Sequence, residues 1–194
     1  MKLKAIDISI AGLFVALMAI GANVAPYLSI GGVPITLQLL FAILAGTLLG
    51  SRLGSISMMA YLLVGLIGAP VFAQFKGGFA ALIGPTFGFV VSFIFVAYVA
   101  GKLVETHVKP KLSTFFIASF VGLLLNYVIG THWMYAALLI WAEAPVGFSY
   151  FVAWSWMVLY LPLDLAVSTV AAIISPRLYK VIQGSKYLQK QRVA

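Results

Sequence analysis

The sequence has few acidic residues, and one of them stands inside an apolar segment, where a charge is costly. Asp164 lies in the stretch MVLYLPLDLAVSTVAA, two residues after Pro162. An ionisable residue deep in such a segment is a functional-site candidate by default. Pro162 leaves a helix carbonyl without its partner and bends the helix, which is expected to open polar backbone toward a cavity. We expect Asp164 to bind a ligand; the alternative is a structural carboxylate that bonds a neighbouring helix.

Other polar and aromatic residues in the apolar segments are candidates for the same cavity. They are Thr36, Gln38, Asn126, Tyr127, His132 and Trp133. A few polar groups among many aromatic side chains are typical of a small-molecule pocket. A lone histidine such as His132 is more often a packed histidine than a metal ligand.

Motifs for enzymatic chemistry are absent from the sequence. It contains no cysteine and no G-x-x-x-x-G-K-[ST], H-E-x-x-H or G-x-S-x-G pattern, which excludes thiolate chemistry, ATP hydrolysis by a P-loop and the common hydrolase sites. It also lacks a pair of intramembrane acids for proton relay. We therefore expect no enzyme, metal or cofactor; an intramembrane enzyme that uses Asp164 and His132 remains the alternative from a different class.

The composition predicts what must position these residues. Of the 194 residues, 63% are hydrophobic and 8% charged, far below the charge of a soluble domain. A spanning helix needs about 20 mostly apolar residues. We predict an all-α membrane protein of one domain, residues 1–194, with six transmembrane helices. Their approximate ranges are 8–28, 35–50, 54–69, 86–104, 114–140 and 149–175.

The net charge of +8 is distributed in a way that predicts orientation. With both termini in the cytoplasm, eleven of the twelve basic residues lie on the inner side, as the positive-inside rule requires. These are Lys2, Lys4, Arg52, Lys102, Lys109, Lys111, Arg177, Lys180, Lys186, Lys190 and Arg192. Lys76 is the exception. The charge thus favours the inner surface of a cell membrane and argues against nucleic acid as a partner. Asp7 and Glu105 near the inner surface and Glu143 in an outer loop are expected to be solvent-exposed.

Two outer connections are rich in glycine and proline. One covers residues 23–38, and the other covers residues 68–89 and remains apolar throughout. Lipid cannot satisfy backbone polar groups, so irregular backbone at membrane depth must pack on protein or line a cavity. We expect residues 68–89 to be a lid over a ligand pocket; an ordinary re-entrant loop is the alternative.

Small residues recur at four-residue spacing in two segments. Gly12 and Ala16 form one pair, and the other set is Ala42, Gly46, Gly50 and Gly54. Such spacing lets another backbone approach one helix face. We expect the second set to serve internal helix packing.

Several motifs resemble, in order and spacing, those of the BioY family, the biotin-binding S components of energy-coupling factor (ECF) transporters. They are GGVPITLQ (31–38), GAPVFA (68–73), GG (77–78), GPTFGF (84–89) and LPLDL (161–165). The similarity spans nearly the whole chain. It implies a six-helix membrane protein of the prokaryotic cell membrane that captures biotin outside and joins one T component and two ATPase subunits. It further implies that Gly12 and Ala16 form a patch that docks on the T component.

The resemblance implies biotin as the ligand, and its chemistry suits the candidate residues. The ureido N–H groups would donate to Asp164, and the apolar part would pack on Phe72, Tyr127 and Trp133. Thr36, Gln38, Thr86 and Asn126 complete the polar set.

The carboxylate of biotin needs a positive or donor-rich end of the pocket. We expect it to meet Lys76 or a nest of backbone N–H groups at Gly77 and Gly78.

One position departs from the family pattern. The family commonly has a lysine three residues after the aspartate, where this chain has Val167. Asp164 must then find another partner or hold a proton. An S component for another vitamin or small metabolite is therefore the nearest alternative, and a purely structural membrane subunit is a third.

Overall fold

The computed structural model describes residues 5–24, 29–30 and 33–184 of the chain, and these residues form a helical bundle. The helices are α1 (Ala5–Asn23), α2 (Gln38–Leu66), α3 (Phe87–Glu105), α4 (Leu112–Ile140) and α5 (Tyr150–Gly184). All five of these described helices are long and apolar enough to cross a membrane. Apolar segments become helices there because a helix satisfies its own backbone hydrogen bonds. The predicted all-α membrane class is confirmed at this level.

Helix α2 folds back on itself at Gly50. Gly50 has φ 85° and ψ 171°, a conformation that is readily available only to glycine. A Cβ added at Gly54 would lie 2.7 Å from the carbonyl oxygen of Ala45, and the side chains of Gln38 and Tyr61 meet at 2.9 Å. Both pairs are symmetric about the break, so residues 38–49 and 51–66 form two antiparallel arms. The break at Gly50 coincides with the end of the predicted span 35–50 and precedes the predicted span 54–69.

The turn between the arms is held by Glu105, the last residue of α3. Its carboxylate accepts hydrogen bonds from the backbone N–H of Ser51 at 2.8 Å and from the Ser51 hydroxyl at 2.7 Å. An acceptor at this place satisfies an N–H at the start of the second arm and suits the positive end of the helix dipole. Glu105 was expected only to face solvent, which is incomplete: its side chain caps a helix.

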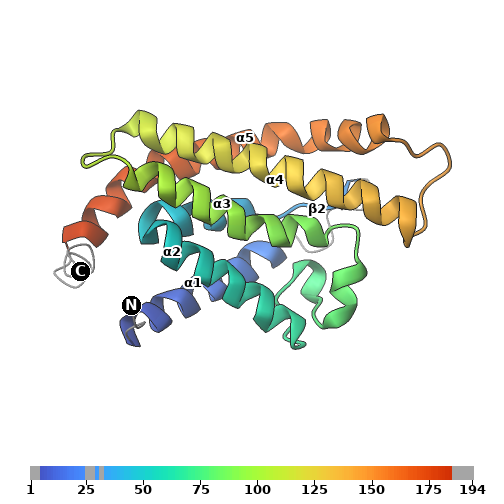
Figure 1. Ribbon diagram of the computed structural model, residues 1–194, viewed down its shortest axis with the longest axis horizontal. Coiled ribbons are helices and arrows are strands. Elements are labelled where there is room, and N and C mark those ends of the chain that lie inside the picture. Colours follow the sequence, from blue (N-terminus) through green and yellow to red (C-terminus); the bar gives the residue numbers. More distant parts are fainter. Residues whose placement is uncertain (1–4, 25–28, 31–32, 185–194) are drawn as a thin grey trace.

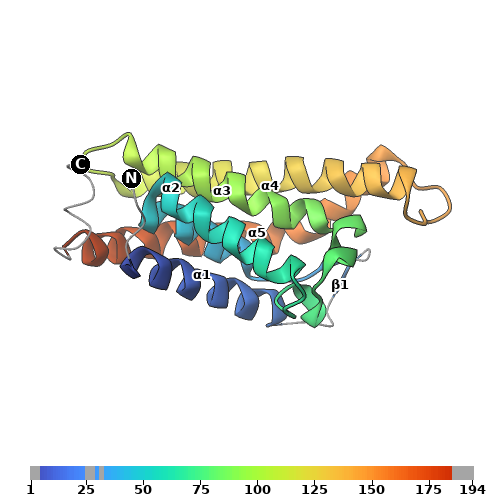
Figure 2. The same cartoon turned by 60° about the horizontal axis from the view of Figure 1, so that its bottom comes forward.

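The bundle has two distinct ends (Figure 1). The start of α1 and the end of α5 lie at one end, and the short elements between the helices lie at the other. These short elements are the antiparallel pair β1 (Ser29–Ile30) and β2 (Val33–Pro34) and the 3-10 turns η1 (Ala73–Phe75) and η2 (Phe79–Ile83). Figure 2 shows α1 crossing the α2 arms on the side away from α4.

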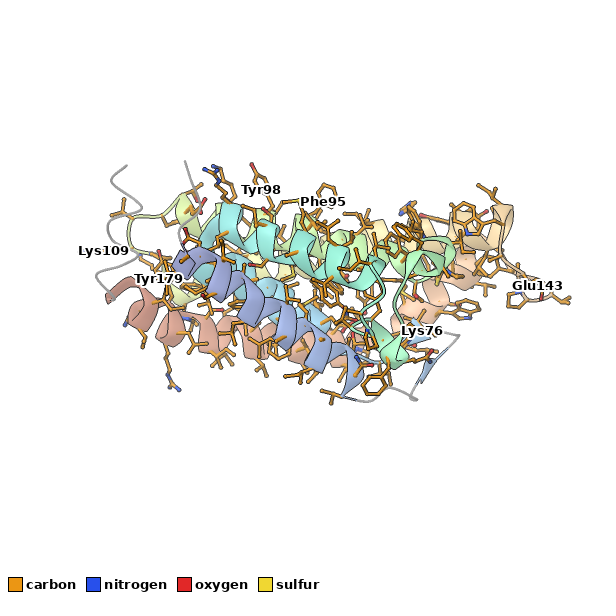
Figure 3. All side chains as sticks on the ribbon, turned by 90° about the horizontal axis from the view of Figure 1, so that it is seen from below. Lys76, Phe95, Tyr98, Lys109, Glu143 and Tyr179 are labelled. Atoms are coloured by element: carbon orange, nitrogen blue, oxygen red, sulfur yellow. The ribbon has the colours of Figure 1, made fainter. Side chains whose placement is uncertain are left out.

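Charged side chains follow the same division. Lys109 lies at one end of the bundle, and Lys76 and Glu143 lie at the other (Figure 3). Lys2, Lys4, Lys186, Lys190 and Arg192 fall outside the described residues. Helix α5 continues past the predicted end at residue 175 to Gly184, because a helix can extend beyond the apolar layer into water.

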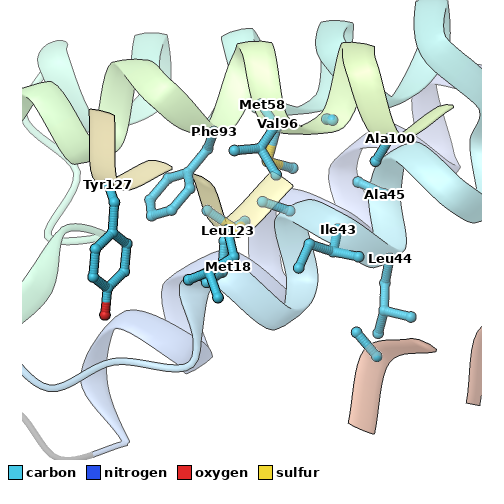
Figure 4. Packing of buried hydrophobic residues seen from close by; sticks show 14 of the residues in the cluster. Met18, Ile43, Leu44, Ala45, Met58, Phe93, Val96, Ala100, Leu123 and Tyr127 are labelled. Atoms are coloured by element: carbon cyan, nitrogen blue, oxygen red, sulfur yellow. The ribbon is translucent and has the colours of Figure 1, made fainter. Parts of the chain in front are cut away.

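The core combines close helix contacts at small residues with larger buried side chains such as Ile43, Met58 and Val96 (Figure 4). Gly46 of α2 lies against the backbone of Ala97 in α3, and Gly101 lies against Ser51, with no room for a Cβ at either glycine. Larger side chains such as Ile43 fill the remaining space and are fully buried. Gly46 and Gly54 thus serve internal packing as predicted, but the break at Gly50 means that the 42–54 set does not share one helix face.

Helix α1 presents one buried stripe and one open face. Asp7, Ala11, Phe14 and Met18 are buried, with Asp7 only 3% exposed. Spacings of three and four residues place them on the same side of the helix. The expectation that Asp7 faces solvent is therefore wrong.

The open face of α1 contains the predicted docking pair. Gly12 and Ala16 are exposed, and a Cβ at Gly12 would meet no atom of the described chain within 4 Å.

Candidate functional site

A cavity of about 420 Å³ lies at the end of the bundle that holds the short elements. This volume is within the range of small-molecule sites, roughly 300 to 1,000 Å³. Side chains from α2 to α5 and from both outer connections line it. Six of the predicted polar residues are among them: Thr36, Gln38, Thr86, Asn126, Tyr127 and Asp164.

Asp164 is held by a hydrogen bond from the neighbouring helix. The hydroxyl of Tyr127 donates to its Oδ2 at 2.7 Å. Oδ1 is not occupied by a described residue and remains an acceptor at the cavity. Val167, which replaces the family's common lysine, is buried and does not line the cavity. Tyr127 therefore supplies the partner that the sequence left unidentified.

Asn126 is held from the opposite side, by α3. Its Oδ1 lies 2.7 Å from the hydroxyl of Ser92, which is fully buried. That hydroxyl is also 2.7 Å from the carbonyl oxygen of Phe89, so its proton has two acceptors. The bond to Ser92 directs Oδ1 of Asn126 toward α3 and leaves the N–H groups of the Asn126 amide as donors.

The second outer connection covers the cavity, and we call residues 68–86 the lid segment. Phe72, Lys76 and Gly77 of this segment line the cavity, as the sequence predicts. Phe72 is only 4% exposed and packs edge-on against Tyr61 and Phe87. The segment is thus an ordered cover built on aromatic contacts.

The lid segment turns through unusual backbone geometry. Gln74 and Phe75 have φ of 63° and 54°, values rare for residues with a Cβ. The N–H of Phe75 donates to the Asn23 Oδ1 at 2.8 Å, which ties the turn to the end of α1. The N–H of Gly78 donates to the carbonyl of Gly65 at 2.7 Å. Gly78 does not line the cavity, so the expected N–H nest loses this donor.

Trp133 has a different place from the one predicted. It does not line the cavity; its ring lies behind Phe87, and its Nε1 donates to the carbonyl of Gly84 at 3.2 Å. Trp141 likewise donates to the carbonyl of Ile83 at 2.7 Å. Trp133 in α4 and Trp141, the residue just after α4, therefore both anchor the end of the lid segment. Sequence spacing could not distinguish a wall residue from the one behind it.

Two further residues of α5, which are not among the predicted ones, complete the wall of the cavity. Met157 and Tyr160 line the cavity together with Asp164, and spacings of three and four residues were the available signal. The hydroxyl of Tyr160 donates to the carbonyl of Val33, which fixes β2 and the first outer connection over the cavity.

His132 lies elsewhere. It is exposed, contacts the carbonyl of Val128 at 2.6 Å and Tyr150 at 3.2 Å, and does not line the cavity with Asp164. Asp164 and His132 therefore do not share a site, as the alternative of an intramembrane enzyme would require. Among the described residues, no group of His, Cys, Asp or Glu is arranged to hold a metal ion.

Comparisons with known proteins agree with the fold and indicate a family. A putative biotin transporter BioYB of Bacillus subtilis is 42% identical over the whole chain and 97% of its own length. The biotin transporter BioY of Thermotoga maritima is 37% identical over 88% of this chain and 94% of its own. A crystal structure of the S-component for biotin from an ECF-type ABC transporter matches with a TM-score of 0.69 and 24% identity, over 92% of this chain and 95% of that one.

The assignment to a family follows from the extent of these matches. The BioY family model matches residues 1–184, which include every helix described above. The chain belongs to the BioY family.

Proposed function

We propose that this chain captures biotin at the outer face of the cell membrane and is the substrate-binding S component of an ECF transporter. The observation that carries the proposal is the covered cavity with Asp164 held by Tyr127, in a chain of the BioY family. The named relatives are transporters, and the proposed function changes no covalent bond of the ligand.

The orientation of the whole chain in the membrane is part of the proposal. We treat the two arms of α2 as separate spans, which makes six spans in one domain. Even crossings return the chain to the side on which it began, and α1 begins where α5 ends. Lys102, Lys109 and Arg177 are at or near this end, so it is assigned to the cytoplasm by the positive-inside rule.

The polar groups of the cavity match the ends of biotin. A ureido N–H would donate to Oδ1 of Asp164, which accepts from no described residue, and the ureido carbonyl would accept from the amide of Asn126. Phe72 and Tyr127 would pack on the apolar part. Lys76 lines the cavity from the lid segment and would pair with the carboxylate.

Partner docking is assigned to the open face of α1. Gly12 and Ala16 are exposed there and would allow a helix of the T component to approach closely. Energy would come from two ATPase subunits, because this sequence has no P-loop. In the membrane, lipid would surround the apolar helices.

Equilibrium binding to the purified chain in detergent tests the proposal. Biotin is titrated against the wild type, Asp164→Asn and Glu143→Gln, with thiamin and riboflavin as alternative ligands. Glu143 is exposed in the outer α4–α5 connection, so its variant removes one negative charge without touching the cavity. The proposal predicts tight binding of biotin alone and weakening only in Asp164→Asn.

Two results would overturn it in different ways. Binding of another vitamin but not biotin would keep the S-component role and change the substrate. Binding of none of the three would remove the basis for a vitamin carrier.

A further inference from the structure

Tyr61 is a buried tyrosine beneath the lid segment. It is fully buried in the second arm of α2 and does not line the cavity. Its hydroxyl contacts two groups, each at 2.9 Å: the carbonyl oxygen of Val71 and the Nε2 of Gln38. One hydroxyl thus joins the lid segment to the first residue of α2.

The directions of both hydrogen bonds follow from the chemistry of the groups. A carbonyl oxygen only accepts, so Tyr61 must donate its single proton to Val71. The phenolic oxygen can then only accept, so Gln38 must turn its NH2 group toward it. Because the amide is planar, the carbonyl oxygen of Gln38 points away from Tyr61. No residue in the described ranges donates to that oxygen.

Of the two groups that Tyr61 holds, one lines the cavity and the other is next to a residue that lines it. Gln38 lines it, while only 5% exposed. Val71 directly precedes Phe72, whose ring covers the cavity and stacks edge-on against Tyr61 at 5.5 Å. The position of the lid segment and the orientation of the Gln38 amide therefore depend on the same proton.

We propose that Tyr61 is a positioning residue that seats the lid segment and orients Gln38 so that its carbonyl oxygen accepts an N–H from the ligand. The substrate class follows: the ligand must donate an N–H at this wall, as a urea or amide group does. If the Gln38 amide were turned the other way, its N–H groups would face the N–H of the ligand, and no hydrogen bond could form. The claim that Gln38 accepts from the ligand rests on the proposed function, whereas the claim that Tyr61 seats the lid segment does not. We call these claims the ligand half and the lid half of the inference.

The first experiment compares Tyr61→Phe with Ser57→Ala. Ser57 is also fully buried, one turn earlier on the same arm, but its hydroxyl bonds the carbonyl of Leu53 in its own helix. Hydrogen exchange of the ligand-free chains is followed at the amides of Phe72 and Gly78, which bond Lys76 and Gly65. Exchange is expected to rise in Tyr61→Phe and to stay at the wild-type level in Ser57→Ala.

Biotin affinity is measured on the same proteins. Tyr61→Phe leaves the Val71 carbonyl and the Gln38 amide without a hydrogen-bond partner, so the Kd for biotin is expected to rise about tenfold. Ser57→Ala should remain within about twofold of the wild type.

Variants of Gln38 separate positioning from a purely structural role. Gln38→Met should weaken biotin binding but leave lid exchange unchanged, because Tyr61 still donates to Val71. Gln38→Glu introduces an acceptor that takes the Tyr61 proton, so lid exchange should rise although Tyr61 is intact. In Tyr61→Phe with Gln38→Met, the loss of affinity should be smaller than the product of the two single losses.

The outcomes are distinguishable. Unchanged lid exchange in both Tyr61→Phe and Gln38→Glu overturns the lid role, and multiplicative losses of affinity overturn the role through Gln38. If Tyr61→Phe does not fold, the two Gln38 variants decide both points. If the wild type binds no biotin, the proposed function and the ligand half fail together, while lid exchange still decides the other half.

Discussion

The Tyr127 hydroxyl donates to Asp164 at 2.7 Å and joins α4 to α5 at the wall of the cavity. The two residues are 37 positions apart in the sequence. This bond occupies one oxygen of the carboxylate and leaves the other for a ligand, so the acceptor has a defined direction before any ligand arrives. Such preorganisation reduces the ordering that binding must impose.

Tyr127→Phe should therefore weaken biotin binding about tenfold, because the carboxylate loses a hydrogen bond of the charge-assisted kind. Isothermal titration on the detergent-solubilised chain measures this. Tyr135→Phe is the matched control, since Tyr135 lies two turns later on α4 and does not line the cavity. Equal affinities for both variants would mean that Tyr127 does not position Asp164.

Lys76→Ala should lower the affinity for biotin by a few fold and leave that for biotin methyl ester unchanged. Lys76 is exposed at the cavity, and a solvent-screened ion pair contributes only about 0.2 to 1 kcal/mol. Competition binding with both compounds gives the comparison. A similar loss for the neutral ester would show that Lys76 does not pair with the carboxylate.

Ala16→Leu should leave biotin binding intact and abolish uptake by cells that also produce the T component and ATPases. The added bulk lies on the open face of α1, away from the cavity, and would keep a partner helix at a distance. Ala166→Leu is the control, because it makes the same substitution at an exposed site of α5. Normal uptake with Ala16→Leu would move the docking surface elsewhere.

Gly50→Ala should destabilise the chain by about 1 to 3 kcal/mol, because a Cβ is strained at this φ and ψ. It would also meet the Glu105 carboxylate that caps the second arm. Thermal unfolding in detergent reports the change, with Gly12→Ala as the control at an open, exposed site. An unchanged midpoint for Gly50→Ala would argue against a fixed turn.

Biotin should slow hydrogen exchange in the lid segment and leave residues 141–149 unaffected. The lid segment lines the cavity, whereas the α4–α5 connection does not. Equal exchange of the lid segment with and without biotin would mean that this cover does not respond to the ligand.

Much of the architecture follows from local properties of the sequence. Apolar stretches had to become helices, since lipid offers the backbone no hydrogen-bond partner. The predicted spans 35–50 and 54–69 imply a turn near residue 50, and Gly50 makes that turn because only glycine readily adopts its backbone geometry. Asp164 stood out because a carboxylate in an apolar stretch needs a reason to be there.

The hydrogen bonds that hold the lid segment were decided by the tertiary structure. Tyr61 joins Val71 to Gln38, and Trp133 holds Gly84 from behind the cavity wall. Which tyrosine or tryptophan meets which carbonyl depends on the register of packed helices, and composition and periodicity do not encode that register. The sequence by itself determined a helical membrane protein and predicted a polar, covered cavity within it, and only packing decided which side chains line the cavity and which hold the cover.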